Sequence, residues 1–577
     1  MAFLRNLLAT LVGLFIFTIL IFFIISGIAA SSETVPEVKA NSILHLNLSG
    51  AVVEKAIDDP VREVLNNGPK QISLLDLLAA VKHAKSNDNI KGIYLEPQFL
   101  MAGYASLQEI RDAILDFKTS GKFVYGYGEY LSEGDYYLMS AADSMYLNPE
   151  GSVEFNGLTA NITFYKGLFE KLDIEPEIFR VGEYKSFVEP FIRKDMSEEN
   201  REQYASLLNS LYDEYLKNVS ATSSIAVSKL EETSDKMLVQ SPEDAINYGL
   251  VHKIAYEDQM VRLLKKEMGL SEDDKLNMMS YSKYSKAAGN GKYSSNKVAV
   301  IVAQGEIVMG EADEAIGGDQ FAREIKKARE NNAIKAIVLR VNSPGGSLTA
   351  SDQIWREIEL TKGVKPIIAS MGDVAASGGY FISMPCDTIV AQPNTITGSI
   401  GIFGMLFNFG DFMENKLGIT TDRVSTGEFS DIMTVTRSLS EEERKIIQKQ
   451  VESGYETFTT KAAQGRNMEV SELKKYAGGR VWSGQQAYER GLVDILGSLD
   501  DAVALAAKNA GVENDFQVRY YPQQKPFIEK ILSDLEEAEV KIFDATPAVL
   551  KPYMEKVKQL ERIQGLQARL PGDLEVR

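Results

Sequence analysis

Cysteine and histidine are scarce in this sequence, which has one cysteine, Cys386, and three histidines in 577 residues. A single cysteine excludes an intrachain disulfide framework and any metal site that needs several cysteines. Basic residues are outnumbered as well, with 62 Lys and Arg against 81 Asp and Glu, so the net charge is -19. Because binding to a phosphate backbone needs a basic surface, this balance argues against nucleic acid as a partner.

A long apolar run lies near the N-terminus. Residues 7–30 carry no charged side chain, and the run is long enough to cross the roughly 30 Å of bilayer hydrocarbon. Arg5 precedes it and Glu33 follows it, which places the short N-terminus in the cytoplasm and the remaining chain on the far side. A cleaved signal peptide is the alternative, although the run exceeds the about 7–15 apolar residues of such a signal. We expect an uncleaved membrane anchor within residues 1–40.

An internal repeat organises the rest of the chain. Ile90–Leu95 (IKGIYL) matches Ile334–Leu339 (IKAIVL) at a shift of 244, and Gly182–Tyr184 matches Gly427–Phe429 at a shift of 245. Further matches follow in the same order at nearly the same shift. A chain of 577 residues is also too long for one hydrophobic core. The sequence therefore predicts a duplicated domain.

Strands alternate with helix-length segments in both copies. Apolar strands are expected at residues 42–48 and 298–303, and long helices are expected to start at Ser197 and Ser440, the latter with a capping box. This alternation predicts an α/β fold with largely parallel strands. The predicted division is an anchor (1–40), a first repeat (41–270), a polar linker (271–296), a second repeat (297–522) and a helical C-terminal extension (523–577).

A glycine pair follows a predicted strand in the second copy only. Residues 341–347 read Val-Asn-Ser-Pro-Gly-Gly-Ser, and Gly345 and Gly346 present backbone N–H groups with no Cβ in the way, which suits an oxyanion hole. A tight strand-to-helix turn is the simpler interpretation of this string by itself. The equivalent stretch of the first copy, residues 97–103, lacks the pair.

The two copies differ in a complementary way at two further positions. Ser377, followed by Gly378, stands where a strand is expected to lead into a helix, and the first copy has Glu133 in its place. Lys185 of the first copy stands where the second copy has Ser430. Taken alone, the serine is explained by the packing of small residues, and Lys185 is explained as an ordinary surface lysine. Together they indicate that one copy keeps a lysine and the other keeps a serine.

An activated serine needs a base. The three histidines, His45, His83 and His252, are interpreted as incidental, which leaves Lys185 as the candidate. An exposed lysine titrates near pKa ~10.4, but burial lowers such a pKa by up to about 3–5 units. We therefore expect Lys185 to be buried away from carboxylates, with its nitrogen within reach of the Ser377 hydroxyl.

These strings resemble the long, duplicated form of the bacterial signal peptide peptidase A family, which are Ser/Lys proteases of the Clp protease/crotonase-like superfamily. The resemblance covers nearly the whole chain and is carried by residues 182–190, 341–347 and 375–380. It implies two tandem Clp/crotonase-like domains after a transmembrane helix. The implied roles are nucleophile for Ser377, base for Lys185, oxyanion donors for Gly346 (or Gly345) and Gly378, and a hydroxyl holding the lysine amine for Ser399.

The same resemblance implies a function and a setting. The chain would be a serine endopeptidase that degrades cleaved signal peptides and other apolar peptides, without a metal or organic cofactor. It would be a homotetramer, held in the bacterial inner membrane by one helix, with its catalytic part facing the periplasm. Two alternatives stay open, a crotonase-like acyl-thioester enzyme and a catalytically silent membrane scaffold. The sequence also leaves open whether Lys185 and Ser377 meet within one chain or between chains.

Overall fold

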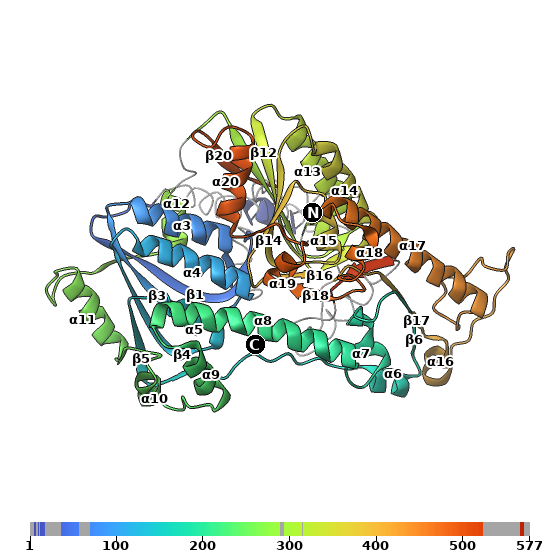
Figure 1. The fold of residues 1–577 in the computed structure, drawn as a ribbon, viewed down its shortest axis with the longest axis horizontal. Coiled ribbons are helices and arrows are strands. Elements are labelled where there is room, and N and C mark those ends of the chain that lie inside the picture. The colour runs from blue at the N-terminus through green and yellow to red at the C-terminus, as the bar shows by residue number, and fades with distance from the viewer. Residues whose placement is uncertain are drawn as a thin grey trace.

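Two α/β units, each built on its own mostly parallel sheet, lie side by side (Figure 1). The computed structural model of the chain describes residues 5–6, 10, 12–17, 36–56, 70–288, 293–313, 315–522 and 566–570. The first unit is blue to green in Figure 1 and the second is yellow to red, and helix α8 (Glu198–Ser223) runs along both.

The sheet of the first unit has the strand order β2-β1-β3-β4-β5-β7, with β8 paired to β1, and all of these pairings are parallel. One face of β1 packs into the core of the first unit, because Leu44, Leu46 and Leu48 are fully buried, whereas His45 and Asn47 on the other face are partly exposed. The strands are β1 (Ser42–Val53), β2 (Gln71–Ser73), β3 (Ile90–Met101), β4 (Phe123–Leu131), β5 (Ser144–Val153), β7 (Lys253–Ile254) and β8 (Asn277–Ser280).

The sheet of the second unit repeats this order, because β9-β12-β14-β15-β19 corresponds to β1-β3-β4-β5-β7. The predicted strands at 42–48 and 298–303 fall within β1 and β9, and the shared order confirms the tandem α/β architecture expected from the repeat. The strands are β9 (Lys297–Gln304), β12 (Ile334–Ser343), β14 (Ile367–Ala376), β15 (Thr388–Ala391), β16 (Ile396–Gly398), β18 (Val481–Ser483), β19 (Ile495–Leu496) and β20 (Gln517–Tyr521).

A third sheet, with the order β11-β10-β13-β21-β17-β6, joins the two units. Strand β6 of the first unit pairs antiparallel with β17 of the second, from Arg180 opposite Phe403 to Glu175 opposite Asn408. This pairing brings the end of β6, and the loop that follows it, onto the second unit. The strands are β6 (Glu175–Arg180), β10 (Ile307–Val308), β11 (Ile316–Gly317), β13 (Gly345–Ser347), β17 (Phe403–Asn408) and β21 (Leu566–Arg569).

Helices cover both central sheets, and the two longest begin at the predicted residues. Ser197 caps α8 by accepting from the Asn200 N–H, and Ser440 forms a capping box with Glu443 at the start of α17. The remaining helices are α3 (Leu74–Ser86), α4 (Tyr104–Lys118), α5 (Glu133–Met139), α6 (Lys166–Leu172), α7 (Glu189–Ile192), α9 (Val227–Asp235), α10 (Pro242–Asn247), α11 (Glu257–Glu267), α12 (Tyr281–Ala288), α13 (Gly318–Glu330), α14 (Leu348–Thr361), α15 (Gly378–Ser383), α16 (Gly410–Phe412), α17 (Glu441–Arg466), α18 (Val470–Leu473), α19 (Gly484–Glu489) and α20 (Leu499–Asn509).

Two segments differ from the sequence predictions. Within the predicted polar linker at 271–296, β8 extends the first sheet and α12 buries Tyr281 and Tyr284 against the first core. The scattered tyrosines of that stretch supply the apolar surface that ties it down. Residues 566–569, within the predicted helical extension, form strand β21, because β13 and β17 both offer it backbone partners.

The predicted anchor at residues 1–40 lies mostly outside the described residues. Within the part of the chain that the structure does describe, no helix has both the length and the apolarity to cross a bilayer. The predicted extension beyond residue 522 is likewise described only at residues 566–570.

Candidate active site

Lys185 enters the second unit from the loop that follows β6. Its side chain is fully buried, and its Nζ lies 2.9 Å from Ser377 Oγ, 3.0 Å from Ser399 Oγ and 3.2 Å from the Ser399 carbonyl oxygen. The structure therefore brings the lysine of one copy to the serine of the other within a single chain.

Ser377 stands at the junction between β14 and α15 in a backbone conformation that few non-glycine residues adopt. Its φ is 56° and its ψ is -113°, a sparsely populated region whose cost the surrounding structure must offset. The Ser377 N–H donates to the carbonyl of Gly398 over 2.9 Å, which ties the strained junction to β16. Ser399, just after β16, also has a positive φ of 50°. Two strained turns thus present their hydroxyls to the same amine.

The predicted glycine turn lies against this serine. Gly345 has a φ of 102°, which favours glycine, and a Cβ on it would lie 2.7 Å from the backbone nitrogen of Gly378. A Cβ on Gly378 would in turn lie 3.1 Å from the nitrogen of Gly346. The backbone nitrogens of Gly346 and Gly378 therefore lie close together beside Ser377, as an oxyanion hole requires.

Burial dominates the electrostatics of the lysine. It lowers the pKa of the Lys185 ammonium well below its usual range, because a buried charge loses its hydration. Lys185 forms no ion pair with any of the described residues, and its three polar neighbours are uncharged. The surroundings of Lys185 therefore favour the neutral amine over the ammonium.

Two residues that the sequence did not single out hold the lysine in place. A Cβ on Gly479, whose φ is 86°, would lie 2.6 Å from the Lys185 Cβ, so only glycine lets the two segments approach so closely. Gln203 of α8 donates to the Tyr184 carbonyl and to Ser186 Oγ, on either side of the lysine, and accepts from the Val481 N–H. Their partners lie far away in the sequence, so no local string reveals them.

The equivalent place in the first unit has no serine hydroxyl. Glu133, which replaces Ser377, accepts from the N–H groups of Asn156 and Gly157, and burial raises its pKa to about 7. Phe155, which replaces Ser399, is buried in the first core.

The three histidines have structural partners of their own in the first unit. His45 pairs with Glu96, His83 with the Tyr284 hydroxyl, and His252 accepts from the Met145 N–H. Among the described residues, no group of three or more His, Cys, Asp or Glu side chains is arranged to hold a metal ion.

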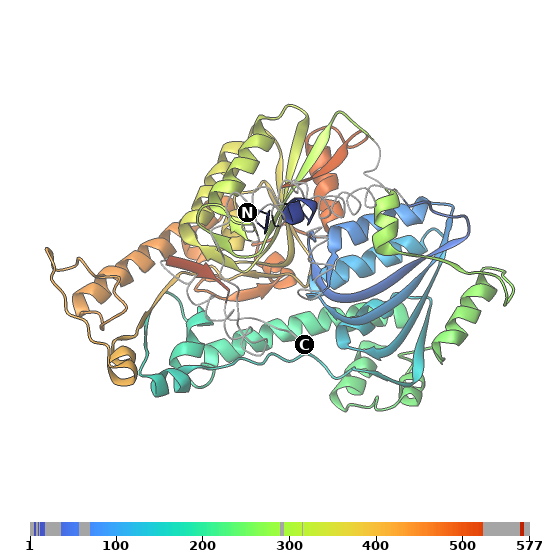
Figure 2. The same cartoon turned by 180° about the vertical axis from the view of Figure 1, so that it is seen from behind.

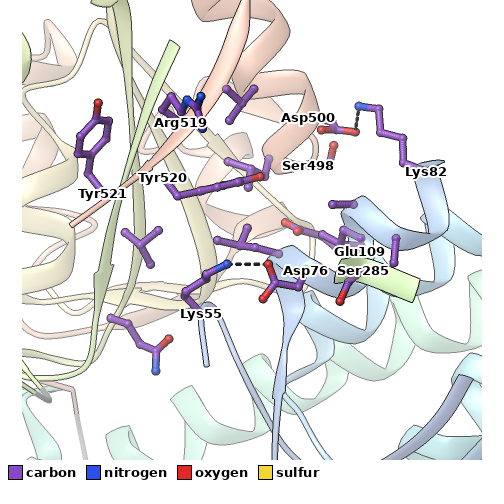
Figure 3. A pocket seen from close by; sticks show the side chains of 18 of the residues that line it. Lys55, Asp76, Lys82, Glu109, Ser285, Ser498, Asp500, Arg519, Tyr520 and Tyr521 are labelled. Atoms are coloured by element: carbon purple, nitrogen blue, oxygen red, sulfur yellow. Dashed lines mark hydrogen bonds and ion pairs between the residues drawn. The ribbon is translucent and has the colours of Figure 1, made fainter. Parts of the chain in front are cut away.

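A large cavity lies apart from the serine and the lysine. Its volume is about 1640 Å³, and it opens between α3 and α4 of the first unit and β20 and α20 of the second (Figure 3). Charges of both signs line it, and two ion pairs, Lys55 with Asp76 and Lys82 with Asp500, stand at its walls. Neither Ser377 nor Lys185 contributes to its lining.

A serine hydroxyl on a strained strand-to-helix turn, beside a buried lysine amine and two backbone N–H groups, is the arrangement of a serine hydrolase. Sequence comparison narrows this class to one family. The profile of peptidase family S49 matches residues 116–271 and again residues 359–513, and the Clp protease profile matches residues 289–396. The chain belongs to peptidase family S49 and is a serine peptidase with a tandem Clp protease-like α/β fold.

Individual relatives agree with this assignment, two of them over most of the chain. "Protease 4" of Salmonella typhi is 37% identical over 86% of this chain and 83% of its own length. The chloroplastic serine protease SPPA of Arabidopsis thaliana is 34% identical over 93% of this chain and 78% of its own length. A putative signal peptide peptidase SppA of Enterococcus faecium is 36% identical over 39% of this chain and 67% of its own length.

The contact between Gly479 and Lys185 leads to a first prediction. Gly479→Ala is expected to lower kcat/KM by about 10²-fold, because the new methyl group displaces the lysine from Ser377 and misplacement by about 1 Å has an effect of that size. Gly511→Ala is the matched control, since Gly511 also has a positive φ (67°) but has no atom near its missing Cβ. Steady-state peptide hydrolysis by both variants measures the effect, and equal activities would show that the contact does not position the amine.

Proposed function

We propose that Ser377 is the nucleophile and Lys185 the general base of this peptidase. The observation that carries the proposal is the distance of 2.9 Å between Lys185 Nζ and Ser377 Oγ, in a site where the lysine side chain is fully buried. A neutral amine accepts a proton, whereas an ammonium does not, so the depressed pKa of Lys185 makes it a base at neutral pH.

The contacts of the amine favour this direction of proton transfer. A neutral amine has two N–H groups and one lone pair. Ser399 offers two acceptors, its carbonyl oxygen at 3.2 Å and its Oγ at 3.0 Å. With both N–H groups directed to Ser399, the lone pair is left for the hydroxyl hydrogen of Ser377. Ser399 thus acts as a positioning residue in the proposal.

Peptide hydrolysis then follows in two halves. Ser377 Oγ attacks the substrate carbonyl carbon while Lys185 takes the hydroxyl proton, and the N–H groups of Gly346 and Gly378 donate to the oxyanion. The N–H of Gly345, in the same turn, is the alternative donor to the oxyanion. We assign the role to Gly346 because its nitrogen lies near Gly378. Lys185 gives its proton to the leaving amine, and water hydrolyses the ester with Lys185 again as base. No cofactor takes part.

We propose cleaved signal peptides and other apolar peptides as substrates. One relative bears the name putative signal peptide peptidase, and extended peptides commonly bind to proteins by adding a strand to a sheet. We also propose that residues 7–30 anchor the protein as a single membrane helix, with the catalytic part facing the periplasm of a bacterial cell. The domain limits proposed are those that the sequence predicts, 41–270 and 297–522.

We further propose that the protein is a homotetramer. A projecting segment between β17 and α17, which carries α16 in Figure 1, exposes several large apolar side chains. Contiguous exposed apolar surface marks sites of contact with other proteins, and a second copy of this chain would cover it. The exposed side chains are Leu417, Ile419, Val424, Phe429, Met433 and Val435.

The pH dependence of hydrolysis tests the proposed base. With an apolar peptide ester and the full chain in detergent, kcat/KM is expected to rise with pH through one ionisation well below the ordinary lysine pKa of about 10.4, because only neutral Lys185 accepts the proton. Ser377→Ala is expected to show no measurable hydrolysis at any pH. A wild-type rate that falls as pH rises, or an active Ser377→Ala variant, would overturn the proposal.

A further inference from the structure

The cavity between α3, α4, β20 and α20 has walls from both units. Figure 2 shows α20 of the second unit, in orange-red, beside the blue helices of the first. The cavity volume of about 1640 Å³ exceeds the roughly 300–1,000 Å³ of ordinary small-molecule pockets. Among the described residues that line it, seven carry a carboxylate and four carry an ammonium or a guanidinium. The cavity is therefore acidic overall, in a place where a ligand contacts both units.

Glu109 of α4 brings a carboxylate oxygen without a partner to the wall of this cavity. The residue is only 3% exposed. Its Oε1 accepts from Arg340 Nη1 over 2.8 Å, whereas its Oε2 is buried and has no hydrogen-bond partner among the described residues. Burial raises the pKa of Glu109 to about 7, although Arg340 opposes the shift. A buried polar atom without a partner is costly, and a cation in the cavity offsets that cost.

Asp112 follows Glu109 by one turn of α4 and lies on the same face of the helix. Both residues line the cavity. Asp112 Oδ1 accepts from the uncharged side-chain amide of Gln108 over 2.9 Å, and burial raises the pKa of Asp112 to about 6. Arg340, which bonds Glu109, is already shared with Glu54. Two neighbouring acidic side chains thus lie at the cavity with less positive charge around them than their own negative charge.

Other parts of the lining suit an alkyl chain. Leu75 and Leu78 of α3 line the cavity from the first unit, and Val518 and Tyr520 of β20 line it from the second. The Tyr520 ring lies 5.8 Å from Lys55 Nζ, so its face already attracts a cation. Among the described residues, no group of acidic or histidine side chains is arranged to hold a metal ion. The lining therefore fits an organic cation rather than a bare metal ion.

We propose that this cavity binds a primary ammonium group carried on an alkyl chain, with the ammonium against Glu109 and Asp112 and the chain against α3 and β20. A free alkyl diamine and the lysine side chain of a peptide both present this chemistry. Because such a ligand contacts both units, it stabilises the junction between them. The inference is independent of the proposed function, since neither Ser377 nor Lys185 lines the cavity.

Isothermal titration calorimetry of the full chain in detergent tests the proposal, with 1,5-diaminopentane as the probe. Wild type and Ser377→Ala are expected to bind the diamine at one saturable site, and 1,5-pentanediol, which lacks the charges, is expected not to bind. Asp112→Asn and Glu109→Gln are each expected to weaken binding by about 10-fold or more, the effect of losing a bond to a charged group. Asp258→Asn, a matched change at an exposed aspartate of α11, is expected to leave binding unchanged.

A variant that fills the cavity keeps the test valid if an acidic variant fails to fold. Ala79 is exposed on α3 and lines the cavity, so Ala79→Trp occupies the space without disturbing the core. This variant is expected to lose diamine binding while it hydrolyses a peptide ester at the wild-type rate. Saturating diamine is expected to raise the urea midpoint of wild type, because a ligand that binds only the folded state stabilises it, and to leave the midpoint of Ala79→Trp unchanged.

A peptide titration identifies the source of the ammonium. Ser377→Ala is titrated with a short acetylated peptide that has one lysine, and with the same peptide in which methionine replaces the lysine. Tighter binding of the lysine peptide than of the diamine assigns the site to peptides, and the reverse assigns it to free amines. Binding of neither ligand, or equal binding by wild type, Asp112→Asn and Ala79→Trp, overturns the proposal. A wild type that binds the diamine but hydrolyses no ester overturns the proposed function alone.

Discussion

Lys185→Met is expected to lower kcat/KM for a peptide ester by about 10³- to 10⁴-fold, the upper part of the range for losing a general base. Methionine has nearly the length of lysine and suits a fully buried site, so the variant removes the proton acceptor while it keeps the packing against Gly401 and Gly479. Lys194→Met, which lies between α7 and α8 and is exposed, is the matched control and is expected to retain wild-type activity.

The same variant is expected to be more stable than wild type below about pH 10. The pKa of Lys185 is lower in the folded protein than in the unfolded chain, so unfolding takes up a proton and wild-type stability falls as pH drops below the unfolded pKa of about 10.4. Methionine carries no such penalty. Urea unfolding at several pH values measures the gain, which should shrink toward pH 10. Full activity in Lys185→Met, or a loss of stability at pH 7, would contradict a buried neutral base.

Arg340→Met is expected to destabilise the protein by about 3–5 kcal/mol, the usual cost of removing one partner from a buried ion pair. Arg340 of β12 is fully buried and bonds Glu54 at 2.9 Å and Glu109 at 2.8 Å, both of which belong to the first unit and are themselves buried. Its removal leaves two carboxylates without a cation at the junction of the units.

A second pair across the units supplies the control. Lys82 of α3 and Asp500 of α20 are 2.6 Å apart but about two-thirds exposed, so Lys82→Ala is expected to cost about 0–1 kcal/mol. Adding Glu54→Gln and Glu109→Gln to Arg340→Met is expected to recover much of the loss, because no buried charge then lacks a partner. Urea unfolding of the three variants gives the comparison, and equal effects of Arg340→Met and Lys82→Ala would show that this network does not hold the units together.

Much of the site could be predicted from the sequence, because the duplication acts as an internal comparison. The alternation of strands and helices and the helix starts at Ser197 and Ser440 follow from patterns that both copies share. The pairing of Lys185 with Ser377 follows from the difference between the copies, although the sequence left open whether the two residues meet within one chain. The glycine turn was predicted for the same reason, since the first copy lacks it at residues 97–103.

Other features depend on contacts that no local pattern shows. Gly479 is important because Lys185, nearly 300 residues earlier in the sequence, packs against it. Gln203 is important because its side-chain amide bonds the backbone of Tyr184 and of Val481. Residues 566–569 read Leu-Gln-Ala-Arg, four residue types that favour a helix. They nevertheless form a strand, because they pair with the backbone of β13 and β17. Whether such a segment forms a strand depends on the strands it meets in the folded protein, and the sequence does not show where the edges of the sheets lie.

Labelling with a fluorophosphonate probe tests the central claim most directly, because such a probe reacts only with an activated serine. In the full chain, wild type is expected to gain one probe mass that peptide mapping assigns to Ser377, and both Ser377→Ala and Lys185→Met are expected to stay unlabelled while folded. Attachment at another residue, or labelling of Lys185→Met at the wild-type rate, would contradict the account of Ser377 activated by Lys185.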